Sequence, residues 1–446
     1  MSSLLITNAR LVNEGKVSDA DVLIRGERIE KIAKSINPPD NARVLDAAGR
    51  WLLPGMIDDQ VHFREPGLTH KGDIASESAA AVAGGVTSFM DMPNVSPQTT
   101  TREALSDKYA AAGGRARANY AFYLGGTNRN LEEIKALRVN EACGIKVFMG
   151  ASTGDMLVDD PDALTKIFAD APVLIVTHCE HSPTIRDNEA RAKAEFGADV
   201  PMSEHPKIRS ATACLASSSI AVDLARRYNA RLHVLHLTTG LEMGLFSRAS
   251  RSEKNITAEV CVHHLWFDES RYEDLGTRIK CNPAIKTAKD REALVSAVND
   301  GRIDIIATDH APHTLAEKKR SYFKAPAGLP LVQHALQILF DLARDSQLSV
   351  ETIVERTSHA VADIFGVVDR GYVREGYFAD LVLIDSEKPY TVEASNLLYK
   401  CHWSPFEGHT FSSTIDTTVV NGTVVFHDGQ LAGDVVGQRL QFSRGR

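Results

Sequence analysis

The stretch GMIDDQVHFREPG, residues 55–67, changes abruptly from apolar to polar. The run that leads into it, WLLPGMI, is apolar, whereas Gln60, His62 and Arg64 follow at every second position. Alternate residues of a β-strand point to the same side, so these three side chains share one face. The stretch therefore predicts a buried strand that ends in a group of polar side chains.

Seven later stretches are also predicted strands, and nearly every one is an apolar run that ends in a polar residue. They are VTSFMDMPN, NYAFYLGG, GIKVFMG, VLIVTHCE, RLHVLHLT, ITAEVCVHH and IDIIATDHAP, with helical patterns such as DIASESAAAVAGG between them. Eight strands that alternate with helices predict the α/β class and a (β/α)8 TIM-type barrel. A doubly wound open sheet is the alternative. We favour the barrel because the strands number eight and their polar ends share a pattern.

Both ends of the chain are rich in short, alternating strands. The N-terminal LLITNARLV and the C-terminal TIDTTVVNGTVVFHDGQLA are examples, and Asn421-Gly422 between two β-branched runs predicts a hairpin. We therefore expect a small β-sandwich domain formed by the N- and C-terminal segments, residues 1–53 and 369–446. Residues 54–368 would form the barrel.

Composition excludes several classes of protein. The 446 residues carry a net charge of −8, which argues against nucleic acid or an anionic membrane as the main partner. We find neither an apolar run long enough for a transmembrane helix nor a signal peptide. The six cysteines form no Cys-x-x-Cys pair, as is typical of reduced thiols in the cytoplasm. We expect a cytoplasmic protein that acts on a small molecule.

Imidazole and carboxylate groups recur at the predicted strand ends. His62, His178, His236 and Asp309 are the ligand types of a zinc-class metal site that leaves a position open. A single strand histidine is more often a hydrogen-bonded core residue. Three histidines at the same end of different strands, together with an aspartate, favour a metal site.

Lys146 in GIKVFMG has two interpretations. It could form a salt bridge with an acid such as Asp309. Alternatively, burial and nearby cations could lower its pKa, so that the neutral amine reacts with CO2 and the resulting carboxylate bridges two metal ions. The sequence leaves both interpretations open.

The chain resembles the amidohydrolase superfamily and, within it, the dihydroorotases. The resemblance covers essentially the whole chain and is carried by PGMIDDQVHFREPG, DMPN, GIKVFMG, THCE, HVLHLT, CNPAIK and ATDHAPH. HFREPG together with ATDHAPH is specific for dihydroorotases over their relatives. GYFADLVLID near the C-terminus resembles the superfamily's returning sandwich strand.

The resemblance implies a role for each site residue. It implies two zinc ions, with a CO2-derived carboxylate on Lys146 bridging them, His62 and Asp309 holding the first ion, and His178 and His236 holding the second. Arg64, Asn94 and His313 match positions that hold the substrate carboxylate, and Asn282 matches a ring-binding position. Arg64 offers a rigid bidentate fork for a carboxylate, although it could instead pair with Asp58, Asp59 or Glu65.

Gln60 departs from the family pattern, which is His-x-His. An amide oxygen is a harder and weaker ligand than imidazole. Three interpretations are open: Gln60 binds the metal through its oxygen, it supports the site while the other ligands suffice, or the first metal is weak or absent.

The resemblance implies the reversible cyclisation of N-carbamoyl-L-aspartate to L-dihydroorotate by a metal-activated hydroxide, with Asp309 as the catalytic acid and base. A hydantoinase or allantoinase is the nearest alternative. A catalytically silent homologue, for instance a scaffold for aspartate transcarbamoylase, is another. The family also suggests a homo-oligomer. We expect residues 322–331, YFKAPAGLPL, to form one wall of the pocket.

Overall fold

Strands from both ends of the chain pair in one sheet. The computed structural model describes residues 3–150 and 154–443. The N-terminal strands are β1 (Ser3–Asn13), β2 (Lys16–Arg25), β3 (Arg28–Ala33), β4 (Arg43–Asp46) and β5 (Trp51–Pro54). The C-terminal strands are β15 (Leu381–Asp385), β18 (Thr414–Val420), β19 (Thr423–His427) and β20 (Gln430–Leu431). The order is β20-β19-β18-β15-β5-β1-β2-β3, with β4 paired to β1.

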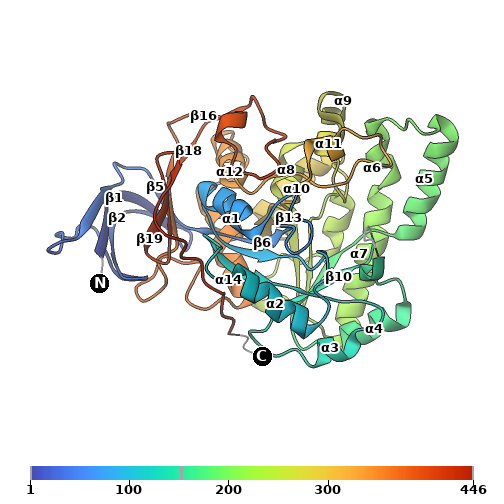
Figure 1. Cartoon of the computed structure of the whole chain (residues 1–446), viewed down its shortest axis with the longest axis horizontal. Helices are drawn as coiled ribbons and strands as arrows, with labels where there is room; N and C mark the ends of the chain where they lie inside the picture. The colour runs from blue at the N-terminus through green and yellow to red at the C-terminus, as the bar shows by residue number, and fades with distance from the viewer. Residues whose placement is uncertain (1–2, 151–153, 444–446) are drawn as a thin grey trace.

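This mixed sheet explains how the two termini come together. β5 pairs antiparallel with β15 and parallel with β1, so the N-terminal strands adjoin the C-terminal ones. In Figure 1 the blue and red strands lie side by side at one end of the molecule. Asn421 and Gly422 have φ values of 49° and 72° and connect antiparallel β18 and β19, which confirms the predicted hairpin. The division at residues 53 and 368 stays a prediction.

The middle of the chain forms parallel strands. They are β6 (Met56–Val61), β7 (Val86–Asp91), β8 (Asn119–Phe122), β9 (Leu124–Gly125), β10 (Ile145–Phe148), β11 (Ile175–His178), β12 (Leu232–Val234), β13 (Ile256–Cys261) and β14 (Ile305–Ala307). They pair in the orders β6-β7-β8 and β14-β13-β12-β11-β10-β9, with every pair parallel. Each of the eight predicted stretches contains one of these strands, and NYAFYLGG contains both β8 and β9.

Helices separate the parallel strands, as the sequence predicts. The longer ones are α1 (Ile74–Ala83), α2 (Arg102–Ala112), α4 (Pro161–Asp170), α5 (Ser182–Phe196), α7 (Ala211–Tyr228), α10 (Ala288–Asp300) and α12 (Ala335–Arg344). The shorter ones are α3 (Leu131–Lys135), α6 (His205–Ile208), α8 (Val262–Trp266), α9 (Tyr272–Leu275), α11 (Leu315–Lys318), α13 (Val350–Val354) and α14 (Ala360–Phe365). Two short strands, β16 (Tyr390–Thr391) and β17 (Thr410–Phe411), pair with each other. Asp73 and Thr287 cap α1 and α10 with their side chains.

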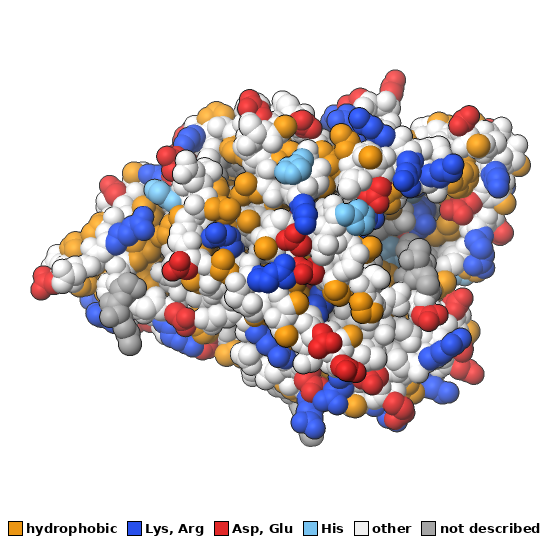
Figure 2. Space-filling model, in the orientation of Figure 1, with side chains coloured by type: hydrophobic (Ala, Val, Ile, Leu, Met, Phe, Trp, Pro, Cys, Tyr) orange, Lys and Arg blue, Asp and Glu red, His pale blue; other side chains and the backbone are white. Residues whose placement is uncertain are grey.

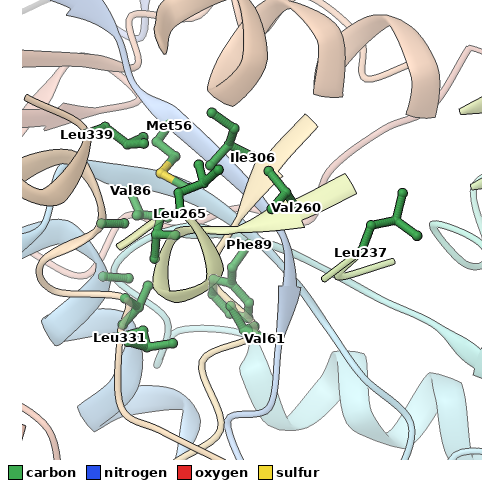
Figure 3. Close-up of a cluster of buried hydrophobic side chains, with 14 of the residues drawn as sticks. Met56, Val61, Val86, Phe89, Leu237, Val260, Leu265, Ile306, Leu331 and Leu339 are labelled. Carbon is green, nitrogen blue, oxygen red and sulfur yellow. The ribbon is translucent and has the colours of Figure 1, made fainter. Parts of the chain in front are cut away.

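The largest core lies between the parallel strands and the helices. Figure 3 shows Met56, Val86, Val260 and Ile306 from four strands gathered near Leu339 of α12, and all five are buried in one cluster. Their apolar surface packs the helices against the sheet. This packing fixes the strands and leaves their C-terminal ends free to carry polar side chains.

The surface drawn in Figure 2 carries charges of both signs, and most of the cysteines are buried. In Figure 2, Lys and Arg side chains are interspersed with Asp and Glu side chains over the face that is drawn. None of the helices in residues 3–150 and 154–443 is long and apolar enough to cross a membrane. The six cysteines form no disulfide bonds with one another. Cys179 is buried, and burial raises the pKa of its thiol to about 12, as expected of a small core residue rather than a nucleophile.

Candidate active site

A pocket lies at the C-terminal ends of the parallel strands. The predicted site residues that line it are Gln60, His62, Arg64, Asn94, Lys146, His178, His236, Asn282 and Asp309. Only His313 of the predicted set stands behind the wall, where its Nε2 lies 3.0 Å from Arg64 Nη2. Ala327 and Gly328 complete one side, so the loop of residues 322–331 does form a pocket wall.

The backbone bends at the residues that enter the pocket. Arg64, His236 and Asp309 have φ values of 70°, 38° and 51°, in the left-handed region that residues other than glycine rarely adopt. The pairing of β6 with β7 also shifts register between Asp58 and Val61. Such strained conformations persist where the surrounding structure holds them, and they concentrate at functional sites. Here they turn strand-end side chains toward one another.

His178 and His236 converge on one point. His178 Nδ1 lies 2.9 Å from His236 Nε2, and burial lowers the pKa of both rings, so the neutral imidazoles that metals require are favoured. The other nitrogen of His178, Nε2, lies 2.9 Å from Glu180 Oε2. That carboxylate is itself paired with Arg209 at 2.6 Å. A carboxylate behind a histidine fixes the ring and leaves Nδ1 as the ligand atom.

Asp309 joins the opposite side of the pocket. Its Oδ1 accepts a hydrogen bond from Gln60 Nε2 at 3.1 Å and lies 3.1 Å from His62 Nε2. His62 Nδ1 lies 2.8 Å from Asn94 Oδ1, which orients the ring. Burial alone would raise the pKa of Asp309, but the contact with His62 outweighs it and the pKa is lowered. An ionised carboxylate and an imidazole nitrogen thus adjoin, as a metal site of the zinc class requires.

Gln60 presents its amide nitrogen, not its oxygen, to Asp309. Its Oε1 is on the side of Cys261, whose Sγ lies 3.9 Å away. The side chain is buried. This arrangement favours a supporting role for Gln60 over direct ligation through the amide oxygen.

Lys146 is buried in the pocket wall without an acidic partner. The ion pairs of residues 3–150 and 154–443 do not include it, and Asp309 is engaged by Gln60 and His62 instead. The ring of Phe148 lies 4.7 Å from Lys146 Nζ. Burial lowers the pKa of this amine to about 8. The salt bridge to Asp309 that the sequence left open is therefore absent from the described part of the chain.

Arg64 is also buried without a carboxylate. Its Nε donates to Pro312 O at 3.0 Å, and its Nη2 faces the ring of His313. Burial lowers the pKa of the guanidinium to about 10. The acids considered as structural partners are engaged elsewhere or lie apart: Glu65 pairs with Arg115, Asp58 accepts from Thr308, and Asp59 faces His233.

Sequence reasoning missed three residues around the pocket. Glu180 and Arg209 support His178, and Lys71 Nζ lies 3.1 Å from His313 Nδ1. Glu180 follows His178 by two residues in THCE, which is a usable signal. Arg209 and Lys71 stand far from their partners in sequence and carry no such signal. His263 and His264 are buried and are not among the residues that line the pocket.

Comparisons with known proteins agree with this architecture. A profile of the Amidohydrolase family matches residues 51–425. A dihydroorotase from Halobacterium salinarum is 34% identical, over 97% of this chain and 100% of that protein. An allantoinase from Desulfitobacterium hafniense is 28% identical, over 98% of each chain. The solved structure of L-hydantoinase (dihydropyrimidinase) from Arthrobacter aurescens superposes with a TM-score of 0.93 at 27% identity, over 99% of this chain and 100% of that one.

Proposed function

We propose a specific reaction for this chain, which belongs to the amidohydrolase family and is therefore a metal-dependent hydrolase. The reaction is the reversible cyclisation of N-carbamoyl-L-aspartate to L-dihydroorotate and water. The dihydroorotase from Halobacterium salinarum and the HFREPG and ATDHAPH motifs support it. The allantoinase and hydantoinase relatives make a neutral cyclic amide the second candidate.

The observation that carries the proposal is that Arg64 forms no ion pair among the described residues. It lines the pocket and is buried, and its side-chain hydrogen-bond contacts there are the carbonyl of Pro312 and the ring of His313. A buried cation without an anion is costly, so a substrate that brings a carboxylate is favoured. Dihydroorotate carries such a carboxylate next to its ring, whereas hydantoin and allantoin do not.

The pocket fits the metal ions that the family implies. We propose zinc as the metal, with His178 and His236 holding one ion, His62 and Asp309 holding the other, and a carboxylated Lys146 joining them. When bound, the ions supply an activated water and polarise the ring carbonyl. Burial lowers the pKa of the Lys146 amine to about 8, which raises its neutral fraction near pH 7 and supports the modification, because only a neutral amine reacts with CO2.

The chain's own residues move protons and orient the substrate. Asp309 accepts the proton of the attacking water in the hydrolytic direction and donates it to the leaving ring nitrogen. Arg64 and Asn94 bind the carboxylate, which positions the ring, His313 supports the guanidinium of Arg64 instead of the direct carboxylate contact that the resemblance implies, and Asn282 contacts the ring. Gln60 donates to Asp309 Oδ1 and holds that carboxylate in place for both tasks.

The remaining finer predictions also belong here. We propose that the parallel strands close into a (β/α)8 barrel. The parallel bridge between Val61 and His310 and the 2.7 Å hydrogen bond from His62 N to His310 O support closure between β6 and the end of β14. The sandwich form of the terminal sheet, the homo-oligomer and the cytoplasmic location stay predictions.

The decisive experiment is steady-state turnover on full-length protein prepared with added zinc. We expect turnover of N-carbamoyl-L-aspartate and of L-dihydroorotate, and much weaker turnover of hydantoin and allantoin. Preferential turnover of a neutral ring would replace the proposal with the second candidate. Folded, zinc-containing protein that turns over none of the four would be a silent homologue, and Gln60→His would then test whether the glutamine is responsible.

A further inference from the structure

A second buried cluster lies directly beneath the pocket. Asp59 of β6, His233 of β12 and Glu259 of β13 are all fully buried, and none of them lines the pocket. Their ligand-type atoms lie within 4.8 Å of one another. β12 and β13 are neighbours in one parallel sheet and β6 belongs to the other, and together they direct two carboxylates and an imidazole to one place.

The spacing within the cluster does not suit hydrogen bonds. His233 Nε2 lies 3.4 Å from Asp59 Oδ2 and 3.6 Å from Glu259 Oε2. Good N–H···O hydrogen bonds span about 2.7–3.2 Å. Zinc bonds of about 2.0–2.2 Å in a tetrahedral arrangement place neighbouring ligand atoms about 3.3–3.6 Å apart. The observed separations therefore equal the edges of a metal site.

The atoms that face this centre lack hydrogen-bond partners, whereas the atoms that face away have them. Both carboxylate oxygens of Asp59, Oε2 of Glu259 and Nε2 of His233 are buried without a hydrogen bond. His233 Nδ1 lies 2.8 Å from Thr257 Oγ1, and Glu259 Oε1 accepts from His236 N at 3.0 Å. Buried polar atoms are nearly always satisfied, so a shared set of unsatisfied ones indicates a missing ligand.

The charge of the cluster specifies the sign of that ligand. Among the described residues, the only ion-pair contact of either Asp59 or Glu259 is with His233. Metal binding requires both carboxylates ionised and the imidazole neutral, and in that state the cluster carries a charge of −2, which a divalent cation neutralises. One imidazole and two carboxylates suit a divalent ion of the zinc class, and the second oxygen of Asp59 can supply a fourth bond.

We propose that Asp59, His233 and Glu259 bind a structural zinc-class ion that is distinct from the metals of the pocket. The ion joins β6, β12 and β13. Glu259 bridges it to the backbone nitrogen of His236, whose φ of 38° is one of the strained values at the site. The ion would thus anchor a pocket residue from below, independently of the reaction proposed above.

Anomalous diffraction at the zinc absorption edge tests the proposal on the full chain crystallised with zinc. We expect a peak between Asp59 Oδ2, His233 Nε2 and Glu259 Oε2, in addition to any peaks in the pocket. Anomalous peaks confined to the pocket would overturn the proposal. The centre would then hold a proton on His233, whose pKa burial lowers and the two carboxylates raise to about 9.

Zinc content provides a second measurement with a matched control. Asp59→Asn should hold one zinc fewer per chain than the natural protein. Asp58→Asn removes the charge of the adjacent buried carboxylate, which bonds to Thr308 outside the cluster, and should keep the full content. Equal zinc content in all three proteins would overturn the proposal. If Asp59→Asn does not fold, the diffraction result on the natural protein decides alone.

Discussion

Two regions of the molecule each contain a buried arginine. One region is the joint between the terminal sheet and the parallel strands, and the other is the pocket. Only the arginine in the joint forms an ion pair with a carboxylate. Arg370 in the joint is 4% exposed, is ion-paired with Asp380 and donates to Asn421 Oδ1 at 2.8 Å. Asp380 also accepts from Asn119 of β8 at 3.1 Å, which ties the two sheets together. Arg64 in the pocket is 6% exposed and has no acidic partner among the described residues.

Two buried lysines repeat this contrast. Lys108 of α2 pairs with Asp91 at 2.7 Å and donates to Met92 O at 2.8 Å, whereas Lys146 has no such acid. A buried charge costs several kcal/mol unless an opposite charge and hydrogen bonds offset it. The chain therefore meets this cost internally where a cation serves the fold. In the pocket no carboxylate among the described residues pairs with the buried cation, so a bound ligand or a covalent modification can offset its charge.

Replacement of Arg370 tests the paired side of the comparison and should have the largest effect. Arg370→Met leaves Asp380 buried without its cation, and breaking such a pair costs about 3–5 kcal/mol. We expect that loss in the free energy of unfolding, measured with urea, while kcat of the folded fraction stays near that of the natural protein. An unchanged unfolding midpoint would show that the joint is not held by this pair.

Replacement of Arg64 tests the unpaired side. Arg64→Met should lower kcat/KM for N-carbamoyl-L-aspartate by about 10²–10³-fold, because it removes the partner of a desolvated carboxylate. The free energy of unfolding should not fall, since no buried acid loses a partner. The zinc content should also stay constant. A normal kcat/KM would refute the proposal that Arg64 binds the substrate carboxylate. A loss of stability like that of Arg370→Met would show that Arg64 also stabilises the fold, as Arg370 does.

The sequence predicted the pocket better than its surroundings, for a physical reason. Parallel strands bring their C-terminal ends together, so the places of His62, His178 and Asp309 follow from strand order alone. The contact of Arg370 with Asp380 and that of Glu180 with Arg209 depend on how loops and layers pack. Alternation along a strand also cannot show which inward residues share a layer, so the cluster of Asp59, His233 and Glu259 was not foreseen.

Glu180 extends the comparison of paired and unpaired buried charges, because this carboxylate contacts the imidazole of His178. Glu180→Gln keeps the shape but removes the charge that orients His178, and losses of this kind weaken metal binding by about 10–100-fold. We expect that decrease in zinc affinity, measured by competition with a chromophoric chelator. The exposed, unrelated Glu132→Gln is the matched control and should bind zinc normally. Equal affinities would mean that His178 is held by packing alone.

The smallest expected effect concerns Lys146, the unpaired lysine, and it varies continuously with pH. Burial lowers the pKa of Lys146 from its usual 10.5 to about 8, so the protonated amine, which cannot attack CO2, dominates only below that pH. In metal-free protein at a fixed concentration of dissolved ¹³CO2, the initial rate of label incorporation at Lys146 should rise about tenfold per pH unit up to about pH 8 and then level off.

Lys146→Met should abolish that signal, which ¹³C NMR resolves from the labelled bicarbonate. A rate that keeps rising to pH 10 would indicate the pKa of an ordinary lysine, and hence a nearby charge that offsets the burial. Lys146 would then belong with Lys108 and Arg370, among the cations that serve the fold. A plateau near pH 8 would place Lys146 with Arg64 among the unpaired cations of the pocket, since the lowered pKa makes its neutral amine available at a lower pH than that of an ordinary lysine.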